Sequence, residues 1–296
     1  MRASLGEILI TRFIRIAGYS AVAFIGMIFV FLILEGAPTL GQVPVSTLVG
    51  ERWYPIEGQF GMLPLLFGSF LVTVGAALVA VPLGVGTAIF ISEVAPRWAR
   101  ELLKPLIELL AGFPSVMLGF LGIVILAPQL YSILGLATGL TAFTGALLLG
   151  WIALPTVVSV GEDALDAVPR TYREAAMALG ATSWQTIWRV TLPAARSGVL
   201  TGVLLGMGRA LGETMAVMMV TGNAPTLPTG LEAIFRPIRT MTATIAAEMG
   251  EVAQGSVHYH TLFFIGIVLF LTSLIVNLAA ASVVFRQRTR GERMLS

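Results

Sequence analysis

The sequence predicts an all-α polytopic membrane protein with six transmembrane helices. Hydrophobic residues occupy 56% of its 296 positions and charged residues only 11%, whereas soluble domains average about 25% charged residues. Four windows hold no Asp, Glu, Lys or Arg, and each reaches about the 20 residues that a helix needs to cross a bilayer. These windows are Ile16–Leu34, Gly58–Ser92, Leu109–Gly161 and Thr261–Phe285.

The third window has room for two crossings and a turn, and another apolar stretch follows a charged loop. The expected spans are therefore Ile16–Leu34, Leu63–Ile91 with a kink at Pro82, Leu109–Pro128, Phe143–Gly161, Gly198–Val220 and Thr261–Phe285. The first apolar run is too long for a signal-peptide core and no A-x-A site follows it, so we expect it to be retained.

The spans divide the chain into three expected regions. Residues 1–61 hold an N-terminal segment, the first span and an outer loop. Residues 62–285 hold the other five spans, a short charged connection at 93–108 and a longer charged loop at 162–196. Residues 286–296 form a basic tail.

Arginine and lysine counts orient these spans. Fourteen basic residues lie in the N-terminal segment, the two charged connections and the tail, against three in the opposite loops. Basic residues concentrate on the cytoplasmic side of a membrane protein. Both termini and the loop 162–196 are therefore expected in the cytoplasm.

The composition also argues against several other classes of function. The chain has no cysteine, and the spacing of His258 and His260 does not match an H-E-x-x-H helix, so we expect no metal site and no cofactor. The only lysine, Lys104, follows Leu103, so no phosphate-binding P-loop can be written and any P-loop ATP hydrolysis must come from another polypeptide. The only aspartates, Asp163 and Asp166, lie in the charged loop, which argues against an intramembrane hydrolase. The arginines flank apolar spans and thus indicate membrane orientation, not nucleic-acid binding.

The loop 162–196 is predicted to fold as helix–glycine–helix. Thr171-x-x-Glu174 fits a capping box, and a helix over about Tyr172–Leu179 would end at Gly180. Thr182-x-x-Gln185 fits a second capping box, and we expect Pro193 to stop the helix that it opens. A loop with this compact helical structure would let a partner protein bind it and transmit movement through it. The alternative is a solvated connector between two spans.

The expected span Gly198–Val220 holds two charges, Arg209 and Glu213. They are four residues apart, so they share a helical face and can pair, and Gly198, Gly202 and Gly206 extend the same stripe. A charge at a helix centre in the membrane costs roughly 2.5–3.5 kcal/mol, so this stripe should face protein or a cavity. The pair either locks a helix interface, or presents Arg209 to a transported anion while Glu213 restrains it.

Two arginines of the outer segment are weaker candidates. Arg236 and Arg239 lie in a polar stretch with Thr240, Thr242 and Thr244. They form either a basic outer entrance or an ordinary solvated surface.

Two stretches resemble known transporters. Glu174-Ala175-Ala176, Gly180 and Val190-x-Leu192-Pro193 resemble the EAA loop of ABC-importer permeases, departing from it only in Val190 for isoleucine. The stretch from Gly208 to Val217 resembles the C-type permease subunits of Pst phosphate importers, and the resemblance extends from about residue 60 to the C-terminus. It implies a type I (MetI-like) ABC importer permease fold, a coupling role for the EAA residues, and a substrate path at Arg209, Glu213 and Thr214.

The resemblance also implies partners and a location. The partners are a second permease subunit (PstA-like), an ATP-binding subunit dimer (PstB-like) and an extracytoplasmic phosphate-binding protein (PstS-like). The location is the bacterial cytoplasmic (inner) membrane, and the subunit itself is non-catalytic. The alternatives are a permease for another oxyanion, such as sulfate, molybdate or phosphonate, and a secondary anion transporter.

Overall fold

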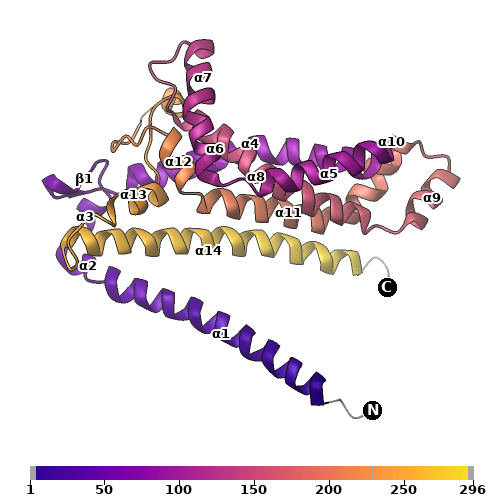
Figure 1. The fold of residues 1–296 in the computed structure, drawn as a ribbon, viewed down its shortest axis with the longest axis horizontal. Coiled ribbons are helices and arrows are strands. Elements are labelled where there is room, and N and C mark those ends of the chain that lie inside the picture. The colour runs from indigo at the N-terminus through magenta and orange to yellow at the C-terminus, as the bar shows by residue number, and fades with distance from the viewer. Residues whose placement is uncertain (1–4, 229, 293–296) are drawn as a thin grey trace.

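The computed structural model of the protein describes residues 5–228 and 230–292. Most of its long helices lie roughly along one common axis, and α7 is oriented across that axis (Figure 1). Within the described residues, six helical stretches are long and apolar enough to cross a membrane, which confirms the expected number. They are Ile10–Gln42, Leu63–Val94, Ser115–Leu134, Ala142–Asp166, Ser183–Gly212 and Val257–Leu278.

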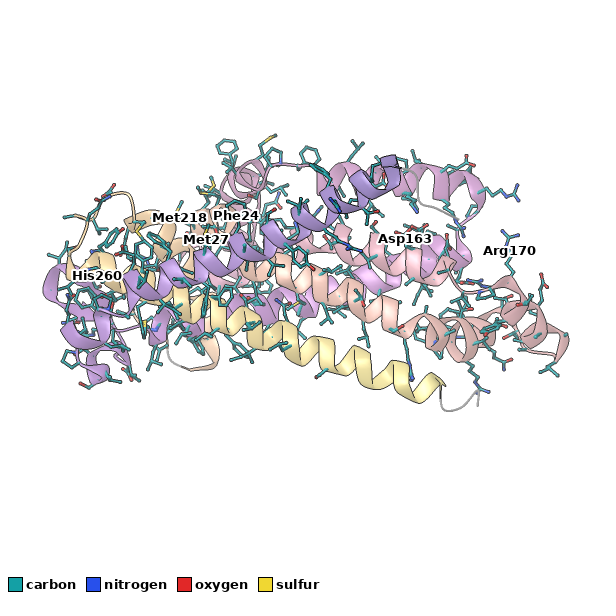
Figure 2. All side chains as sticks on the ribbon, turned by 90° about the horizontal axis from the view of Figure 1, so that it is seen from below. Phe24, Met27, Asp163, Arg170, Met218 and His260 are labelled. Atoms are coloured by element: carbon teal, nitrogen blue, oxygen red, sulfur yellow. The ribbon has the colours of Figure 1, made fainter. Side chains whose placement is uncertain are left out.

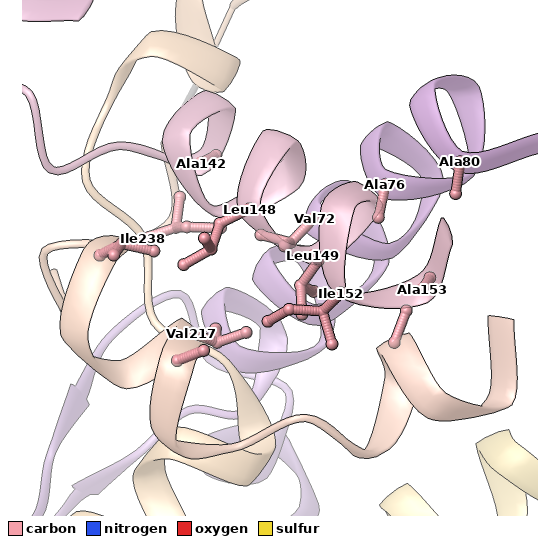
Figure 3. Close-up of a cluster of buried hydrophobic side chains, with 13 residues drawn as sticks. Val72, Ala76, Ala80, Ala142, Leu148, Leu149, Ile152, Ala153, Val217 and Ile238 are labelled. Atoms are coloured by element: carbon pink, nitrogen blue, oxygen red, sulfur yellow. The ribbon is translucent and has the colours of Figure 1, made fainter. Parts of the chain in front are cut away.

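The centre of the fold is formed by three spans, α4 (Leu63–Ile89), α8 (Ala142–Asp166) and α11 (Leu192–Gly212). Their buried side chains make one apolar cluster, in which Val72, Ala76 and Ala80 of α4 meet Leu149, Ile152 and Ala153 of α8 (Figure 3). Many of these residues are small, which allows helix backbones in a membrane to approach closely.

Glycines mark the closest approaches between these spans. A Cβ added to Gly75 would lie 2.6 Å from that of Ala146, and one added to Gly206 would lie 2.6 Å from Val157 Cγ2. Gly202 and Gly206 are both buried against α8. The glycine stripe of the fifth span therefore faces protein, as the sequence predicted.

The charged connection expected at 93–108 is present but longer than expected, because the third span begins at Ser115 and not at Leu109. The end of α4 continues into a π-helical turn, η2 (Phe90–Val94), and the charged segment then forms α5 (Arg97–Ala111), which packs on α8. The chain next forms α6 (Ser115–Leu121), η3 (Gly122–Leu126) and α7 (Ala127–Leu134). The break between α5 and α6 falls before Pro114, because proline lacks an N–H and disfavours helical backbone in the preceding residue.

The loop 162–196 also begins later than expected. Helix α8 continues to Asp166, and Glu162 lies inside it, only 2% exposed. Burying this carboxylate is possible because Lys104 Nζ lies 2.7 Å from Glu162 Oε2. The apolar window ended at Gly161, but the helix does not.

The first and last helices, α1 (Leu5–Gly36) and α14 (Val257–Glu292), contact one another mainly near the start of α14 and diverge from there (Figure 1). Phe31 packs edge-on against Phe263 with ring centroids 5.5 Å apart. The backbone of α14 runs through residue 286 without a break at the start of the expected basic tail, whose residues 293–296 lie outside the described part.

The two segments expected on the outer side form a small cap, called the outer cap. It contains α2 (Thr39–Gln42), α3 (Val45–Leu48), an antiparallel pair of β1 (Trp53–Tyr54) and β2 (Gln59–Phe60) joined by η1 (Pro55–Glu57), then η5 (Leu231–Phe235) and α13 (Met241–Glu248). Isolated bridges join Arg52 to Thr226 and Gly222 to Ile238. The two outer segments, far apart in sequence, are thus one unit.

Candidate substrate path and coupling loop

The fifth span is broken at the predicted charged site. Helix α11 ends at Gly212, Glu213 has extended backbone (φ −68°, ψ 131°), and a short helix α12 (Met215–Val220) follows. The expected continuous helix over Gly198–Val220 is therefore wrong at its outer end. Broken helices expose backbone polar groups, and in transporters they are tolerated where they line a site or are buried in protein.

The other end of this span also differs from the expectation. Leu192 and Pro193 begin α11 and do not end a helix, because a proline in the first turn removes only an N–H that has no helical partner there. A π-helical turn, η4 (Ile187–Thr191), joins α10 (Ser183–Thr186) to α11, so the span extends from Ser183 to Gly212.

Arg209 contacts two other helices. Its Nη2 donates to the carbonyl of Ala111 at 3.2 Å, and its Nη1 donates to Thr156 Oγ1 of α8 at 3.4 Å. Ala111 is the last residue of α5, where carbonyls lack helical partners and the helix dipole favours a cation. Among the described residues Arg209 forms no ion pair with Glu213, because the helix that would align them ends between them.

Glu213 instead shapes the break. Its Oε1 accepts hydrogen bonds from the backbone N–H of Thr214 at 3.0 Å and of Ala216 at 3.3 Å, so it caps α12. Its carbonyl accepts from Thr242 Oγ1 at 3.1 Å. Thr214 Oγ1 donates to the carbonyl of Gly212 at 3.2 Å. The three predicted path residues thus lie together, but each has its own partners.

A small cavity of about 10 Å³, lined by both polar and apolar residues, lies beside Glu213. Hydroxyl groups of α4 and of the turn into α13 line it: Ser69, Thr73, Thr240 and Thr242. Ser69 Oγ accepts from the backbone N–H of Met241 at 2.9 Å, which ties α13 to α4. This volume is about that of one water molecule, so it is too small for an oxyanion.

The loop after α8 carries the EAA residues at the end of the molecule. Helix α9 (Arg170–Ala178) has no buried residue, so Glu174 and Ala175 are exposed and Ala176 is half-buried. Gly180 has a left-handed backbone (φ 87°), which favours glycine. Figure 2 shows Arg170, the first residue of α9, at the end of the long helices opposite His260.

The structure confirms one of the two predicted capping boxes. Thr182 Oγ1 accepts from the N–H of Gln185, and the Gln185 side chain accepts from the N–H of Thr182. The first box is wrong, because α9 begins after Pro169 without a side-chain cap. Pro169 itself fixes the start of the helix, so Thr171 falls inside the first turn.

Three charged contacts at this end were not predicted. Arg173 pairs with Glu93 at 2.6 Å, Ser92 Oγ donates to Asp166 Oδ1 at 2.5 Å, and Lys104 bridges Glu162 and Asp163. Hydrogen bonds and attraction from Glu162 and Asp163 raise the pKa of Lys104 above its ordinary value, against a smaller opposing effect of burial. For the Lys104 contact, the only sign in the sequence is Glu162, an acidic residue directly after a long apolar run. Nothing in the sequence identifies Lys104 as its partner.

The two predicted outer arginines lie in different environments. Arg236 is 55% exposed and faces Glu232 at 3.7 Å, whereas Arg239 Nη1 donates to Glu248 Oε1 at 2.7 Å. The same carboxylate accepts from Trp53 Nε1 at 3.0 Å and lies 2.8 Å from His258 Nε2. Arg239 is thus held within the outer cap, while Arg236 stays on its surface.

Similar solved structures support the fold. The chain is similar to a subunit of the MetNI methionine ABC transporter solved in an inward-facing conformation, with a TM-score of 0.56, 18% identity, and coverage of 77% of this chain and 94% of that one. It is also similar to a chain of a bacterial ABC transporter that imports the polysaccharide alginate, with a TM-score of 0.56, 18% identity, and coverage of 94% and 98%. The expected type I (MetI-like) importer permease fold is confirmed.

Related sequences cover most of the chain. It is 41% identical over 251 residues to the probable ABC transporter permease protein YqgH of Bacillus subtilis, covering 83% of this chain and 80% of the relative. It is 34% identical over 291 residues to the phosphate transport system permease protein PstC of Mesorhizobium japonicum, covering 92% and 88%. A family model described as binding-protein-dependent transport system inner membrane component matches residues 80–290. With six apolar spans among its described residues, the chain is a multi-pass protein of the inner membrane and belongs to the family of binding-protein-dependent transport system inner membrane components.

Proposed function

We propose that this chain is the C-type permease subunit of an ATP-driven importer for inorganic phosphate. The observation that carries the proposal is the similarity to PstC, which covers about nine-tenths of both chains at 34% identity. The broken fifth span supports it, because an arginine and a helix break in the membrane are typical of a site for a charged substrate.

The small cavity beside Glu213 favours a path that this chain shares with a second, PstA-like permease subunit. At about 10 Å³ it cannot hold phosphate. In this proposal Arg209 faces the shared path and attracts the anion, while Glu213 and Thr214 fix the shape of the break. The guanidinium of Arg209 has donors left for the anion, because only two of its five N–H groups have partners among the described residues, namely Thr156 and the carbonyl of Ala111.

The energy for transport comes, in this proposal, from a PstB-like ATP-binding dimer on the cytoplasmic side. Glu174, Ala175, Ala176 and Gly180 form the surface on which that dimer acts, and Leu192 and Pro193 transmit the movement within the fifth span, where they begin α11. This assignment requires both termini to be cytoplasmic, as the distribution of arginine predicts. Exposed α9 fits such a docking helix, since no residue of it is buried in the chain itself.

On the outer side, a PstS-like binding protein would deliver phosphate to the cap. Exposed Arg236 is the better candidate for an outer entrance. We assign Arg239 a supporting role there, because its guanidinium is already engaged by Glu248.

Two alternatives remain distinct and testable. Sulfate, molybdate and phosphonate share the anionic charge that Arg209 would attract, so an importer for another oxyanion has the same features. The experiment is uptake of radiolabelled phosphate into proteoliposomes that contain this chain with its neighbouring subunits, ATP and the binding protein. Competition by excess phosphate and not by sulfate, molybdate or phosphonate supports phosphate import, and the reverse pattern contradicts it.

A secondary anion transporter is the other alternative. It would account for Arg209 but would leave the exposed α9 without a partner. Uptake by cells depleted of ATP, with the proton gradient held, distinguishes the two classes. Phosphate uptake that persists under those conditions contradicts an ATP-driven importer.

A further inference from the structure

Helix α9 is joined to the membrane spans by very little apolar contact. No residue of α9 is buried, and in Figure 1 it lies at the end of the molecule, beyond the ends of the long helices. A helix held only by the flexible chain at its two ends would move without moving the spans. The contacts that attach α9 to the spans therefore determine whether a displacement of α9 also displaces the spans.

Helix α9 contacts α10 and η4 of the fifth span, and one of its side chains, Arg173, attaches it by hydrogen bonds to α4 and α8 as well. Arg173 is only 18% exposed, and its guanidinium lies against Glu93, whose side chain is 9% exposed. Nη2 donates to Glu93 Oε1 at 2.6 Å, and Nε donates to Oε1 at 3.1 Å and to Oε2 at 3.3 Å. Arginine holds a carboxylate in a fixed orientation through such paired donors, which lysine does not provide.

The same guanidinium also binds the end of α8. Nη1 donates to the carbonyl of Val168 at 2.7 Å, and Nη2 donates to the carbonyl of Leu165 at 2.9 Å. Both carbonyls lie at the end of α8, where carbonyls lack the regular i+4 helical partner; that of Leu165 also accepts from the N–H of Val168 at 3.2 Å. Arg173 therefore connects three elements: α9, the end of α8 and the π-helical turn that ends α4.

Both of those spans reach the candidate substrate path. Helix α4 carries Ser69 and Thr73, which line the cavity beside Glu213, and α8 carries Thr156, which accepts from Arg209. The ends of α4 and α8 are also joined directly, since Ser92 donates to Asp166. Arg100 of α5 adds an indirect connection, because it donates to the carbonyls of Ile91 and Ser92 and lies 3.9 Å from Asp166. A displacement of Arg173 thus acts on two spans that are already tied together.

We propose that Arg173 and Glu93 form the mechanical link between the coupling helix and the spans, so that they position α4 and α8 in response to the ATP-binding subunits. The proposal rests on the proposed function of this chain as an importer subunit. Arg173 is a positioning residue and does not touch the substrate. A partly open cavity of about 380 Å³ lies beside the pair, which lines it together with Ser92, Arg100, Asp166, Arg170, Glu174 and Met177.

The test is a double-mutant cycle in the complete importer, reconstituted in proteoliposomes with its binding protein. The variants are Arg173→Gln, Glu93→Gln and the double variant, with Arg173→Lys as the conservative change. For each, phosphate uptake and ATP hydrolysis are measured on the same sample, together with copurification of the ATP-binding subunit. Arg97→Gln is the matched control, because Arg97 is an exposed arginine at the start of α5, outside the loop.

We expect each single variant to copurify and hydrolyse ATP as the unmodified importer does, while phosphate moved per ATP falls by about tenfold. The double variant should be no worse than either single variant, and Arg173→Lys should recover only part of the ratio. Multiplicative losses in the double variant, or an unchanged ratio in Arg173→Gln, would overturn the proposal. Loss of both copurification and ATP hydrolysis would show that the pair is needed for assembly, and this result would also overturn the proposal. If the unmodified importer shows no ATP-dependent uptake, the proposed function fails instead.

Discussion

The guanidinium of Arg209 lies at the C-terminal end of α5, where its Nη2 is 3.2 Å from the carbonyl oxygen of Ala111. A cation is stabilised there because the last carbonyls of a helix carry a partial negative charge and lack helical partners. The contact joins α5, the helix that precedes the third span, to the broken fifth span. An anion that binds Arg209 must therefore share it with, or take it from, this helix end.

The first prediction concerns the charge of Arg209. We expect Arg209→Gln to lower phosphate uptake at least about tenfold, because a charge-assisted hydrogen bond contributes about 1.5–3 kcal/mol. Copurification with the other subunits should be preserved. Arg97→Gln, which removes an exposed arginine elsewhere, should transport normally, and normal uptake by Arg209→Gln would exclude this cation from the path.

The second prediction concerns the turn at Gly180. Its φ of 87° is unfavourable for any residue with a Cβ, so Gly180→Val should distort the turn after α9 at a cost of about 1–2 kcal/mol. We expect ATP hydrolysis to continue with little uptake, since the docking helix would be misaligned. Gly250→Ala is the control, because Gly250 has no positive φ and an added Cβ meets nothing within 4 Å. Full uptake by Gly180→Val would contradict a coupling role for this turn.

The third prediction compares two glycines on one helix. A Cβ at Gly206 would lie 2.6 Å from Val157 Cγ2 and 3.3 Å from the carbonyl of Ala153, whereas at Gly208 it would meet only Asn277 Oδ1 at 3.9 Å. Gly206→Ala should therefore lower the free energy of unfolding by about 1–3 kcal/mol, as overpacking does. Thermal unfolding in detergent should show a lower midpoint for Gly206→Ala only. Equal midpoints for the two variants would show that α11 and α8 are less tightly packed than described.

The fourth prediction concerns Lys104 and the buried Glu162. Lys104→Met should lower the free energy of unfolding by about 1–3 kcal/mol, because Glu162 stays buried without its partner. The loss is not larger, because Lys104 is partly exposed and solvent already screens its charge in the unmodified protein. The raised pKa of Lys104 means that the stabilisation is fully present below its ordinary pKa of about 10.5. It is lost as the pH rises through the higher folded-state pKa. The difference between the two proteins in thermal midpoint should thus be constant from neutral pH to pH 9 and shrink only above pH 10.5; a difference that shrinks below pH 9 would contradict it.

The sequence was sufficient for features that depend on local pattern. Apolar length predicted six spans, the spacing of Gly198, Gly202 and Gly206 predicted a face in contact with protein, and Thr182-x-x-Gln185 predicted a capping box. Each of these is decided by residues within a few turns of one another. The same holds for the glycine turn at Gly180.

The features that the sequence did not predict depend on distant partners. Glu213 is compatible with a helix, and it ends one here because its carboxylate caps α12 and its carbonyl is held by Thr242. Arg209 binds a backbone carbonyl 98 residues away, a target that has no side-chain signature. Arg173 and Glu93 are 80 residues apart, so only the packing of α4 against α8 brings them together.

The central claim is that phosphate passes this subunit only when force from an ATP-binding partner reaches its membrane spans. The most direct measurement is phosphate uptake into proteoliposomes that contain both permease subunits and the binding protein, with and without the ATP-binding subunits. We expect uptake only when those subunits and hydrolysable ATP are present. Phosphate uptake by vesicles that contain this chain without any ATP-binding subunit would contradict the account.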